Sequence, residues 1–318
     1  MNKPLVLLSR RLPIADREEG WLALKRLAKV VVPTRTAALV RNPQLKQATG
    51  IISLVTDTID KAFLDRAPKL RVIGNYGVGY NNIDVDEATR RGIIVCNTPD
   101  VLTNATAELT IALLLVAGRR FREGHELIRK KAFKAWDPNL LLGRELSGSR
   151  LGIVGYGRIG QSVAQKARAL GMDVVVHSRL ARQNRFPDAK FVTFDELLRT
   201  SDFVSLHCPL SSETLGLIGP KQFAMMKPGS YLVNTARGEI VDERALLSAL
   251  NKGSLRGAAL DVFCNEPQLK AALRTHPLLF VLPHLGSATL EARSGMARLA
   301  VNAVLEVLSG RNPQNRVT

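Results

Sequence analysis

The sequence predicts a doubly wound α/β protein with two parallel sheets, each covered on both faces by helices. Short apolar runs alternate with amphipathic stretches along most of the chain, as parallel strands linked by helices require. The alternation runs in two series, one before residue 98 and one after residue 150, and 318 residues suit about two domains. A glycine-rich turn opens the second series. These three observations define the predicted doubly wound class.

The first series contains five apolar runs that we expect to be strands: 5–8, 30–32, 51–55, 71–74 and 93–96. Between them, residues 59–67 and 84–91 have the apolar spacing of amphipathic helices. Residues 103–120 then read as one helix, apolar nearly all round and therefore buried, with Thr103 or Asn104 as its cap.

The second series predicts a sheet of about six strands: 151–154, 174–176, 203–206, 231–234, 258–262 and 280–283. A helix at 158–170 places Ile159, Val163, Ala167 and Leu170 on one face, and residues 193–196 form a capping box. Further helices are expected at 242–250 and 288–308. The last one can return to the first domain, so we expect one domain from 1–101 with 286–318 and another at 102–285.

Composition excludes several classes of protein. With 46% hydrophobic and 23% charged residues, the chain is not expected to be disordered. Its three cysteines are far apart and show no disulfide or metal-ligand spacing, which favours a reducing compartment. The longest apolar run, residues 111–117, is too short to span a membrane, so a cytoplasmic protein is expected. The net charge of +17 indicates attraction to anions without identifying one.

The glycine-rich turn is a G-x-G-x-x-G motif at residues 155–160, which consists of Gly155, Tyr156, Gly157, Arg158, Ile159 and Gly160. It follows an apolar strand and opens an amphipathic helix, which is the context of a dinucleotide-binding Rossmann domain. Gly155 allows a tight turn, Gly157 lets the backbone approach a pyrophosphate, and Gly160 allows helix and strand to pack closely. The N-terminus of the helix would then face the phosphates.

The end of the next strand indicates which dinucleotide is bound. NAD enzymes usually carry Asp or Glu there, but this chain has His177-Ser178-Arg179, with Arg182 and Arg185 following. A guanidinium can pair with a 2′-phosphate, whereas an acid would repel it. Ser178 and Arg179 therefore predict a preference for NADP(H), with NAD(H) as the alternative cofactor.

Three polar residues follow predicted strands, where doubly wound sheets place their sites: Arg237, Glu266 and His284. Besides a hydride donor, the reduction of a carbonyl group needs a cation that polarises the carbonyl, an acid that supplies a proton and a partner for that acid. Taken singly, each residue has an ordinary structural explanation. His207 also ends a strand, and position alone does not separate it from His284.

The combination is more specific. The segments N-T-A-R-G-E-I-V-D (234–242), D-V-F-C-N-E-P (261–267) and P-H-L-G-S-A-T (283–289) follow the glycine motif in this order. Together they closely resemble the D-isomer-specific 2-hydroxyacid dehydrogenases, and the resemblance covers essentially the whole chain. Residues 75–85, 97–108 and 136–146 are most similar to those of glyoxylate/hydroxypyruvate reductases within that family.

This resemblance implies a smaller flavodoxin-like substrate domain beside the Rossmann domain, and a role for each candidate. His284 would donate the proton, Glu266 would hydrogen-bond it, and Arg237 would hold the substrate carboxylate and carbonyl. The substrate pocket would also include Leu54, Val78 and Gly79. The Asp261 carboxylate would bind the nicotinamide amide. Other implied cofactor contacts are Thr106, Cys208, Pro209, Thr214, Thr235, Ala236 and Gly286.

The family also implies a homodimer, with residues 103–150 at the dimer contact. Trp136 would either reach the partner's active site or serve as a simple interface aromatic. The implied reaction is NAD(P)H-dependent reduction of glyoxylate to glycolate and of hydroxypyruvate to D-glycerate, with small 2-oxo or 2-hydroxy acids as substrates.

Three alternatives stay open at this point. The first is a related dehydrogenase for bulkier acids of the phenylpyruvate type, because no motif fixes the size of the pocket. The second is a dinucleotide-sensing interaction protein like the corepressors of this fold, which keep a similar Arg–Glu–His set. The third is nucleic-acid binding, which rests on charge alone and has no recognised motif. We therefore expect no nucleic acid, no membrane and no metal among its partners.

Overall fold

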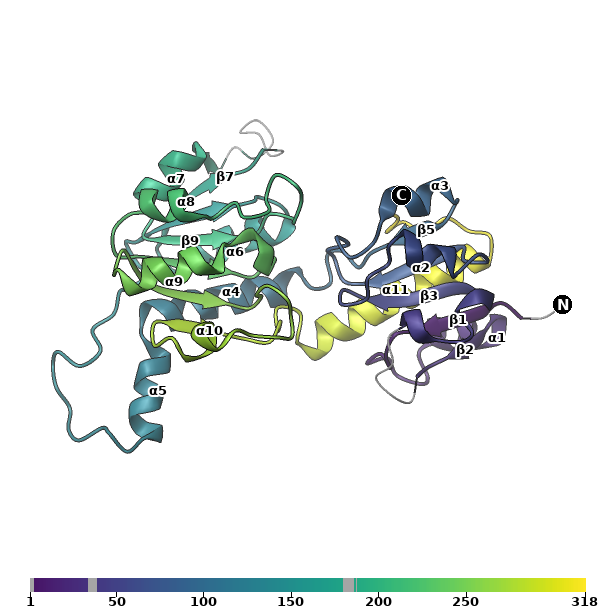
Figure 1. The fold of residues 1–318 in the computed structure, drawn as a ribbon, viewed down its shortest axis with the longest axis horizontal. Coiled ribbons are helices and arrows are strands. Elements are labelled where there is room, and N and C mark those ends of the chain that lie inside the picture. Colours follow the sequence, from purple (N-terminus) through teal and green to yellow (C-terminus); the bar gives the residue numbers. More distant parts are fainter. Residues whose placement is uncertain (1–2, 34–38, 180–185, 187) are drawn as a thin grey trace. The chain divides into compact units, whose positions relative to one another are not determined.

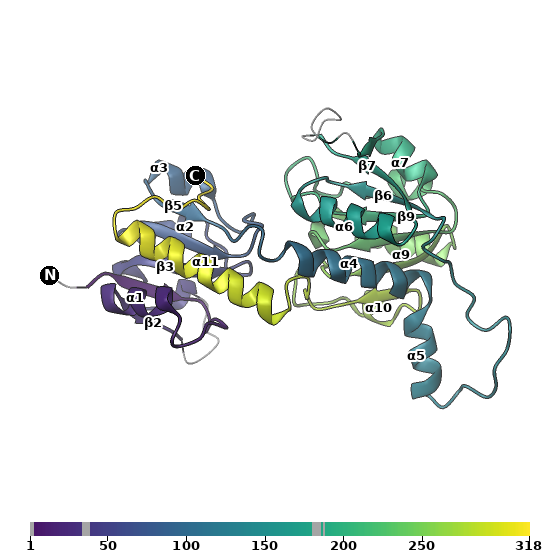
Figure 2. The same ribbon diagram turned by 180° about the vertical axis from the view of Figure 1, so that it is seen from behind.

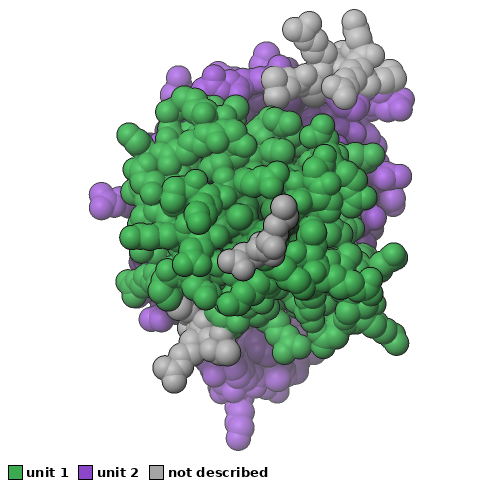
Figure 3. Space-filling model, turned by 90° about the vertical axis from the view of Figure 1, so that its right-hand side faces the viewer, with its two compact units in different colours: residues 1–102, 288–318 green, residues 103–287 purple. Residues whose placement is uncertain are grey.

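The computed structural model describes residues 3–33, 39–179, 186 and 188–318 (Figure 1). The chain divides into two compact units, unit 1 at residues 1–102 with 288–318 and unit 2 at residues 103–287, coloured in Figure 3. These limits lie within two residues of the domain boundaries expected from the sequence. The functional name of each unit stays a prediction.

Unit 1 contains a five-stranded parallel sheet in the order β2-β1-β3-β4-β5. The strands are β1 (Leu5–Leu8), β2 (Lys29–Val31), β3 (Ala48–Leu54), β4 (Val72–Tyr76) and β5 (Ile94–Cys96). This 2-1-3-4-5 order is that of flavodoxin-like folds, which confirms the expected class.

Helices cover both faces of this sheet (Figures 1 and 2). They are α1 (Glu19–Leu27) and α11 (Leu290–Leu308) on one face, and α2 (Lys61–Asp65) and α3 (Val85–Arg90) on the other. Helix α11 approaches β4 so closely that a Cβ at Gly74 would lie 2.9 Å from the Ala300 carbonyl oxygen. Helix α2 is shorter than expected, because Ile59 pairs with Ile83 in a β-bridge and Asp60 then caps the helix.

Unit 2 contains a seven-stranded parallel sheet in the order β12-β11-β10-β9-β6-β7-β8. The strands are β6 (Arg150–Val154), β7 (Asp173–His177), β8 (Lys190–Phe191), β9 (Phe203–Leu206), β10 (Ser230–Asn234), β11 (Leu255–Leu260) and β12 (Leu279–Val281). The order reverses between β6 and β9, as in a Rossmann domain. The prediction of about six strands omits β8, whose two residues are too short to show periodicity.

Two apolar cores separate this sheet from its helices. On one face lie α4 (Thr103–Gly118) and α6 (Arg158–Ala169), side by side in Figure 2, and on the other lie α7 (Phe194–Thr200), α8 (Pro220–Met225) and α9 (Glu243–Asn251). The remaining helices are α5 (Phe121–Arg129) and α10 (Ala271–Thr275). Leu170 was expected on the buried face of α6 but is 43% exposed, because the helix ends at Ala169.

The described residues contain no helix with the length and apolarity that a membrane crossing needs. Within the same residues, His, Cys, Asp and Glu form no group of three or more that could hold a metal ion.

Candidate active site

The glycine-rich turn joins β6 to α6 at the point where the strand order reverses. Gly155 has a φ of +97°, in the region that favours glycine, and a Cβ there would overlap the backbone of His207 and Cys208. A Cβ at Gly160 would overlap the Gly155 carbonyl oxygen, so only glycine lets α6 pack on this turn. At Gly157, the N-cap residue directly before α6, the same Cβ would meet nothing within 4 Å. The backbone there is open to a ligand.

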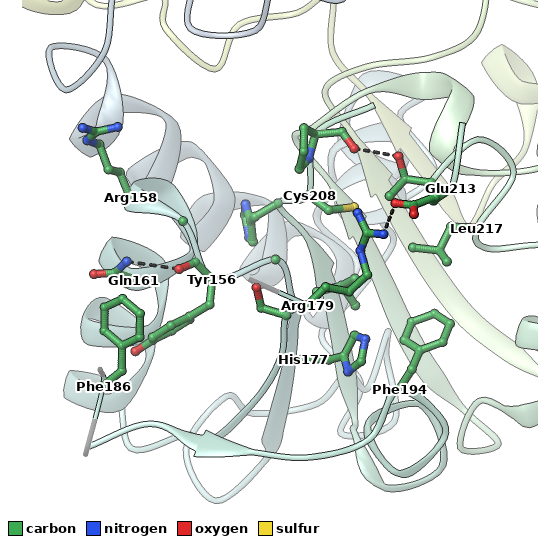
Figure 4. A pocket seen from close by; sticks show the side chains of 17 residues that line it. Tyr156, Arg158, Gln161, His177, Arg179, Phe186, Phe194, Cys208, Glu213 and Leu217 are labelled. Atoms are coloured by element: carbon green, nitrogen blue, oxygen red, sulfur yellow. Dashed lines mark hydrogen bonds and ion pairs between the residues drawn. The ribbon is translucent and has the colours of Figure 1, made fainter. Parts of the chain in front are cut away.

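A cavity of about 610 Å³ lies beside this turn (Figure 4). Nine of the predicted cofactor residues line it: Gly155, Tyr156, Gly157, Arg158, Ser178, Arg179, Cys208, Pro209 and Thr214. The aromatic side chains of Phe186 and Phe194 complete its apolar part. An apolar cavity at a helix N-terminus and a sheet switch point fits a bound dinucleotide.

The other predicted cofactor residues do not line this cavity. Ile159 and Gly160 belong to α6, and Thr106 belongs to α4. Thr235 and Ala236 follow β10, where the Thr235 hydroxyl lies 3.0 Å from that of Thr110. Their roles as cofactor contacts stay predictions.

The surroundings of Arg179, at the end of β7, differ from those expected from the sequence. We expected no carboxylate near Arg179, but the Glu213 side chain, from the loop after β9, forms an ion pair with its guanidinium (Figure 4). Sequence analysis missed this acid because it lies 34 residues from Arg179 along the chain. Arg182 and Arg185 lie outside the described residues.

The predicted acid and its partner are in contact. The Nδ1 atom of His284 lies 2.9 Å from Oε2 of Glu266, while Oε1 of Glu266 accepts a hydrogen bond from the Phe263 N–H at 3.2 Å. The two side chains are 32% and 23% exposed, so solvent and small molecules can reach them. Because Glu266 engages Nδ1, the other ring nitrogen, Nε2, is the one left for a reactant.

Asp261 holds the backbone that carries His284. Its Oδ1 and Oδ2 accept hydrogen bonds from the N–H groups of Leu285 and Gly286 at 2.6 and 2.7 Å, and its carbonyl accepts from the His284 N–H at 2.8 Å. Burial raises the pKa of Asp261, against the opposing effect of these two donors. His284 itself has a φ of +57°, an uncommon conformation that these bonds stabilise. Nicotinamide binding by Asp261 stays a prediction.

His207, the other histidine at a strand end, is in a different environment. Its Nε2 lies 2.8 Å from the Ser205 hydroxyl, and its buried Nδ1 has no hydrogen-bond partner among the described residues. Burial lowers the pKa of His207 to about 3. Burial therefore favours the neutral form of this ring, and its Nε2 meets a hydroxyl, whereas His284 meets a carboxylate.

Arg237 extends from a tight turn at the end of β10. Asn234 fixes this turn, since its Nδ2 donates to the Arg237 carbonyl at 2.8 Å and its Oδ1 accepts from the Ala236 N–H at 2.9 Å. Burial lowers the pKa of the Arg237 guanidinium, and the carboxylates of Glu239 and Glu266 oppose that shift. A Cβ at Gly238 would overlap the Phe263–Cys264 backbone, so the Arg237 turn packs directly on the loop of Glu266.

Glu243 is a site residue that sequence analysis missed. It is buried at the start of α9, where its Oε1 accepts from the Cys264 N–H at 2.8 Å and its Oε2 pairs with Lys270 Nζ at 2.6 Å. Both partners belong to the loop that contains Glu266. An acid in the first turn of a helix is ordinary in sequence, so no local signal reveals this contact.

Unit 1 carries the predicted pocket residues Leu54, at the end of β3, and Val78 and Gly79, just after β4. Asparagines hold this second loop: Asn97 Nδ2 donates to the Val78 carbonyl at 2.9 Å and Asn75 Nδ2 to the Gly79 carbonyl at 2.8 Å. Within the described residues, no hydrogen bond is found for the N–H groups of Val78 and Gly79. Two adjacent unpaired donors suit an anion.

Comparisons with known proteins identify the family of this chain. Residues 111–286 match the family model of the D-isomer specific 2-hydroxyacid dehydrogenase, NAD binding domain. The chain is 42% identical to a glyoxylate reductase of Thermococcus litoralis over 99% of this chain and 97% of that protein.

Two solved structures are also similar. A glyoxylate reductase from Paecilomyes thermophila has a TM-score of 0.89 at 34% identity, covering 100% of this chain and 99% of that one. An NADPH-dependent glyoxylate/hydroxypyruvate reductase from Sinorhizobium meliloti, solved with NADP and malonate, has a TM-score of 0.88 at 30% identity, covering 100% and 97%.

Proposed function

Because this chain belongs to the D-isomer-specific 2-hydroxyacid dehydrogenase family, we propose that it reduces small 2-oxo acids with a nicotinamide dinucleotide. The proposed reactions are glyoxylate to glycolate and hydroxypyruvate to D-glycerate. The observation that carries the proposal is the contact between His284 Nδ1 and Glu266 Oε2, on a loop against which the Arg237 turn packs. Relatives named for these two substrates support the choice of acid.

Each residue of this set has one task in the reduction. When bound, the reduced dinucleotide supplies a hydride to the 2-oxo carbon. Arg237 binds the carboxylate and the carbonyl oxygen and stabilises negative charge as it develops on that oxygen. His284 transfers the proton on Nε2 to the same oxygen, so that hydride and proton together convert the carbonyl to a hydroxyl. Glu266 orients the ring through Nδ1.

The proposed substrate contacts of unit 1 act on the carboxylate. The N–H groups of Val78 and Gly79 would donate to one of its oxygens, and Leu54 would line the pocket. Bonds to the carbonyls of the same two peptide planes support this role. The Val78 carbonyl, which shares a plane with the Gly79 N–H, accepts from Asn97, and the Gly77 carbonyl, which shares a plane with the Val78 N–H, accepts from the Thr98 N–H at 3.0 Å.

The test is the oxidation of NADPH and NADH, followed by absorbance, with glyoxylate, hydroxypyruvate and phenylpyruvate as separate substrates. We expect turnover with the first two acids. Turnover with phenylpyruvate alone would favour the dehydrogenase of bulkier acids. Tight cofactor binding without turnover of any 2-oxo acid would favour the dinucleotide sensor.

We further propose a preference for NADP(H), carried by Ser178 and Arg179 in the cavity. Replacing Arg179 with alanine should lower kcat/KM for NADPH about tenfold and change that for NADH less. A charged hydrogen bond contributes about 1.5–3 kcal/mol, and we take the low end because the Arg179 side chain is 58% exposed. The control is Arg199→Ala, which removes an exposed arginine from α7. Equal losses with both cofactors would contradict the 2′-phosphate assignment.

We also propose that the protein is a homodimer and that residues 121–142 form its contact. Six of the twelve exposed large hydrophobic side chains in the described chain lie there: Phe121, Ile128, Phe133, Trp136, Leu140 and Leu142. Helix α5, within this stretch, buries none of its residues. So much exposed apolar surface in one segment is typical of an interaction surface.

Replacing Trp136, which is 79% exposed, with aspartate should weaken the dimer about 30-fold or more, the loss expected for a central interface aromatic. Sedimentation equilibrium measures this dissociation. Leu170→Asp places the same charge on an exposed leucine outside the segment and should leave the dimer intact. A monomeric wild-type protein, or a dimer unaffected by Trp136→Asp, would contradict the proposed contact.

A further inference from the structure

The ion pair of Arg179 and Glu213 brings opposite charges together at the edge of the cavity. Arg179 follows β7, and Glu213 lies in the loop between β9 and α8. Both residues line the cavity, and their side chains are 58% and 59% exposed (Figure 4). The Glu213 carboxylate is therefore paired with the guanidinium that would bind a 2′-phosphate. Because both side chains are exposed, either can move into solvent.

The loop before α8 holds Glu213 in a defined position. Its neighbour Thr214 is buried, and the Thr214 hydroxyl donates to the Pro209 carbonyl at 2.6 Å while accepting from the Ser211 N–H at 2.8 Å. The N–H groups of Thr214 and Leu215 both donate to the Ser211 carbonyl. These bonds close the loop into a turn, so the Glu213 backbone stays beside Arg179 even when its side chain is displaced.

We propose that Glu213 sets the cofactor selectivity of this site by competing with the 2′-phosphate for Arg179. The inference rests on the proposed use of a nicotinamide dinucleotide. A 2′-phosphate carries nearly two negative charges, so it must displace the carboxylate from the guanidinium and remain near it. A 2′-hydroxyl is neutral and can donate to a carboxylate. Glu213 thus weakens NADP(H) binding more than NAD(H) binding and makes the site less selective than Arg179 alone would.

Neutralising Glu213 separates competition from two other roles that this residue could have, because each role predicts a different change in the binding of a 2′-phosphorylated ligand. If Glu213 oriented Arg179 for the phosphate, neutralising it would weaken binding of the phosphorylated ligand. If the pair were only a surface ion pair, neutralising Glu213 would alter both ligands equally. Competition predicts tighter binding of the phosphorylated ligand alone, and only while Arg179 is present.

The test uses 2′,5′-ADP and 5′-AMP, which differ by the 2′-phosphate and need no 2-oxo acid. Calorimetry would give the Kd of each for the wild-type protein, Glu213→Gln, Arg179→Ala and the double variant. Glu213→Gln should tighten 2′,5′-ADP about three- to fivefold relative to 5′-AMP, as expected for charge interactions between exposed groups. In the Arg179→Ala background the relative gain should fall below twofold. High salt should also reduce the relative gain that Glu213→Gln gives in the presence of Arg179.

The control is Glu196→Gln, which removes one exposed carboxylate from α7 and accounts for the change in net charge. Weaker or unchanged relative binding of 2′,5′-ADP by Glu213→Gln would overturn the competition, while the proposed function would stand as long as both nucleotides bind. If the wild-type protein binds neither nucleotide, the dinucleotide assignment itself fails, and the inference fails with it.

Discussion

Replacing His284 with glutamine should lower kcat for glyoxylate reduction by about 10²- to 10⁴-fold, the range that a positioned general acid contributes. Glutamine keeps a polar side chain that can still meet Glu266, but its amide has no proton acidic enough to transfer to the carbonyl oxygen. The Kd of NADPH should change less than twofold, because His284 does not line the described cavity. Steady-state kinetics and a fluorescence titration of NADPH measure the two quantities.

A glutamine substitution at a second histidine serves as the control. His276 bonds to Asn251 and lies in another part of unit 2, so His276→Gln should keep nearly the full kcat. His207 is a poorer control, since it lines the cavity and its loss would disturb cofactor binding. If His284→Gln retained more than a tenth of the wild-type kcat, another group would have to supply the proton.

The construction of parallel sheets made Arg237, Glu266 and His284 candidates from sequence, and the resemblance of their three segments to a known family separated them from residues such as His207. Arg237, Glu266 and His284 each follow a strand, and parallel strands bring their carboxyl ends to one edge of the sheet. Residues far apart in the chain therefore meet without any need to predict side-chain contacts. The contact between His284 and Glu266 and the packing of Gly238 on the Glu266 loop are consistent with that reasoning.

The residues that sequence analysis missed act between loops. Glu213 reaches Arg179, and Glu243 reaches Cys264 and Lys270, through contacts that depend on loop conformation. Neither acid belongs to a motif with a physical requirement of its own. Their positions follow from local hydrogen bonds, such as those of Thr214, which become visible only in three dimensions.

In the fold as well, features with a long sequence pattern could be predicted and features that depend on tertiary contacts could not. Long apolar alternation predicted both sheets, since burial on two faces leaves a strong signal in the sequence. Strand β8 has only two residues, and the first turn of the predicted helix at 59–67 is extended instead, because Ile59 pairs with Ile83. Pairings of this kind depend on tertiary structure and leave no periodicity.

Replacing Arg237 with alanine should lower kcat/KM for glyoxylate by about 10²- to 10³-fold, as expected when a preorganised charge at a developing oxyanion is removed. The guanidinium is already desolvated and its turn is fixed by Asn234, so little reorganisation is needed when the substrate binds. Arg237→Lys should recover only part of the loss, because an ammonium group lacks the planar fork that binds a carboxylate and a carbonyl together.

The separate effects of Arg237→Ala on kcat and on KM distinguish the possible roles of Arg237 in binding the substrate anion. Arg244→Ala removes an exposed arginine from nearby α9 and should leave both constants within twofold of the wild type. A rise in KM with unchanged kcat in Arg237→Ala would mean that Arg237 binds substrate and transition state equally. A fall in kcat as well would place its charge on the reacting oxygen, as proposed. If Arg237→Ala behaved like Arg244→Ala, another group would have to bind the carboxylate.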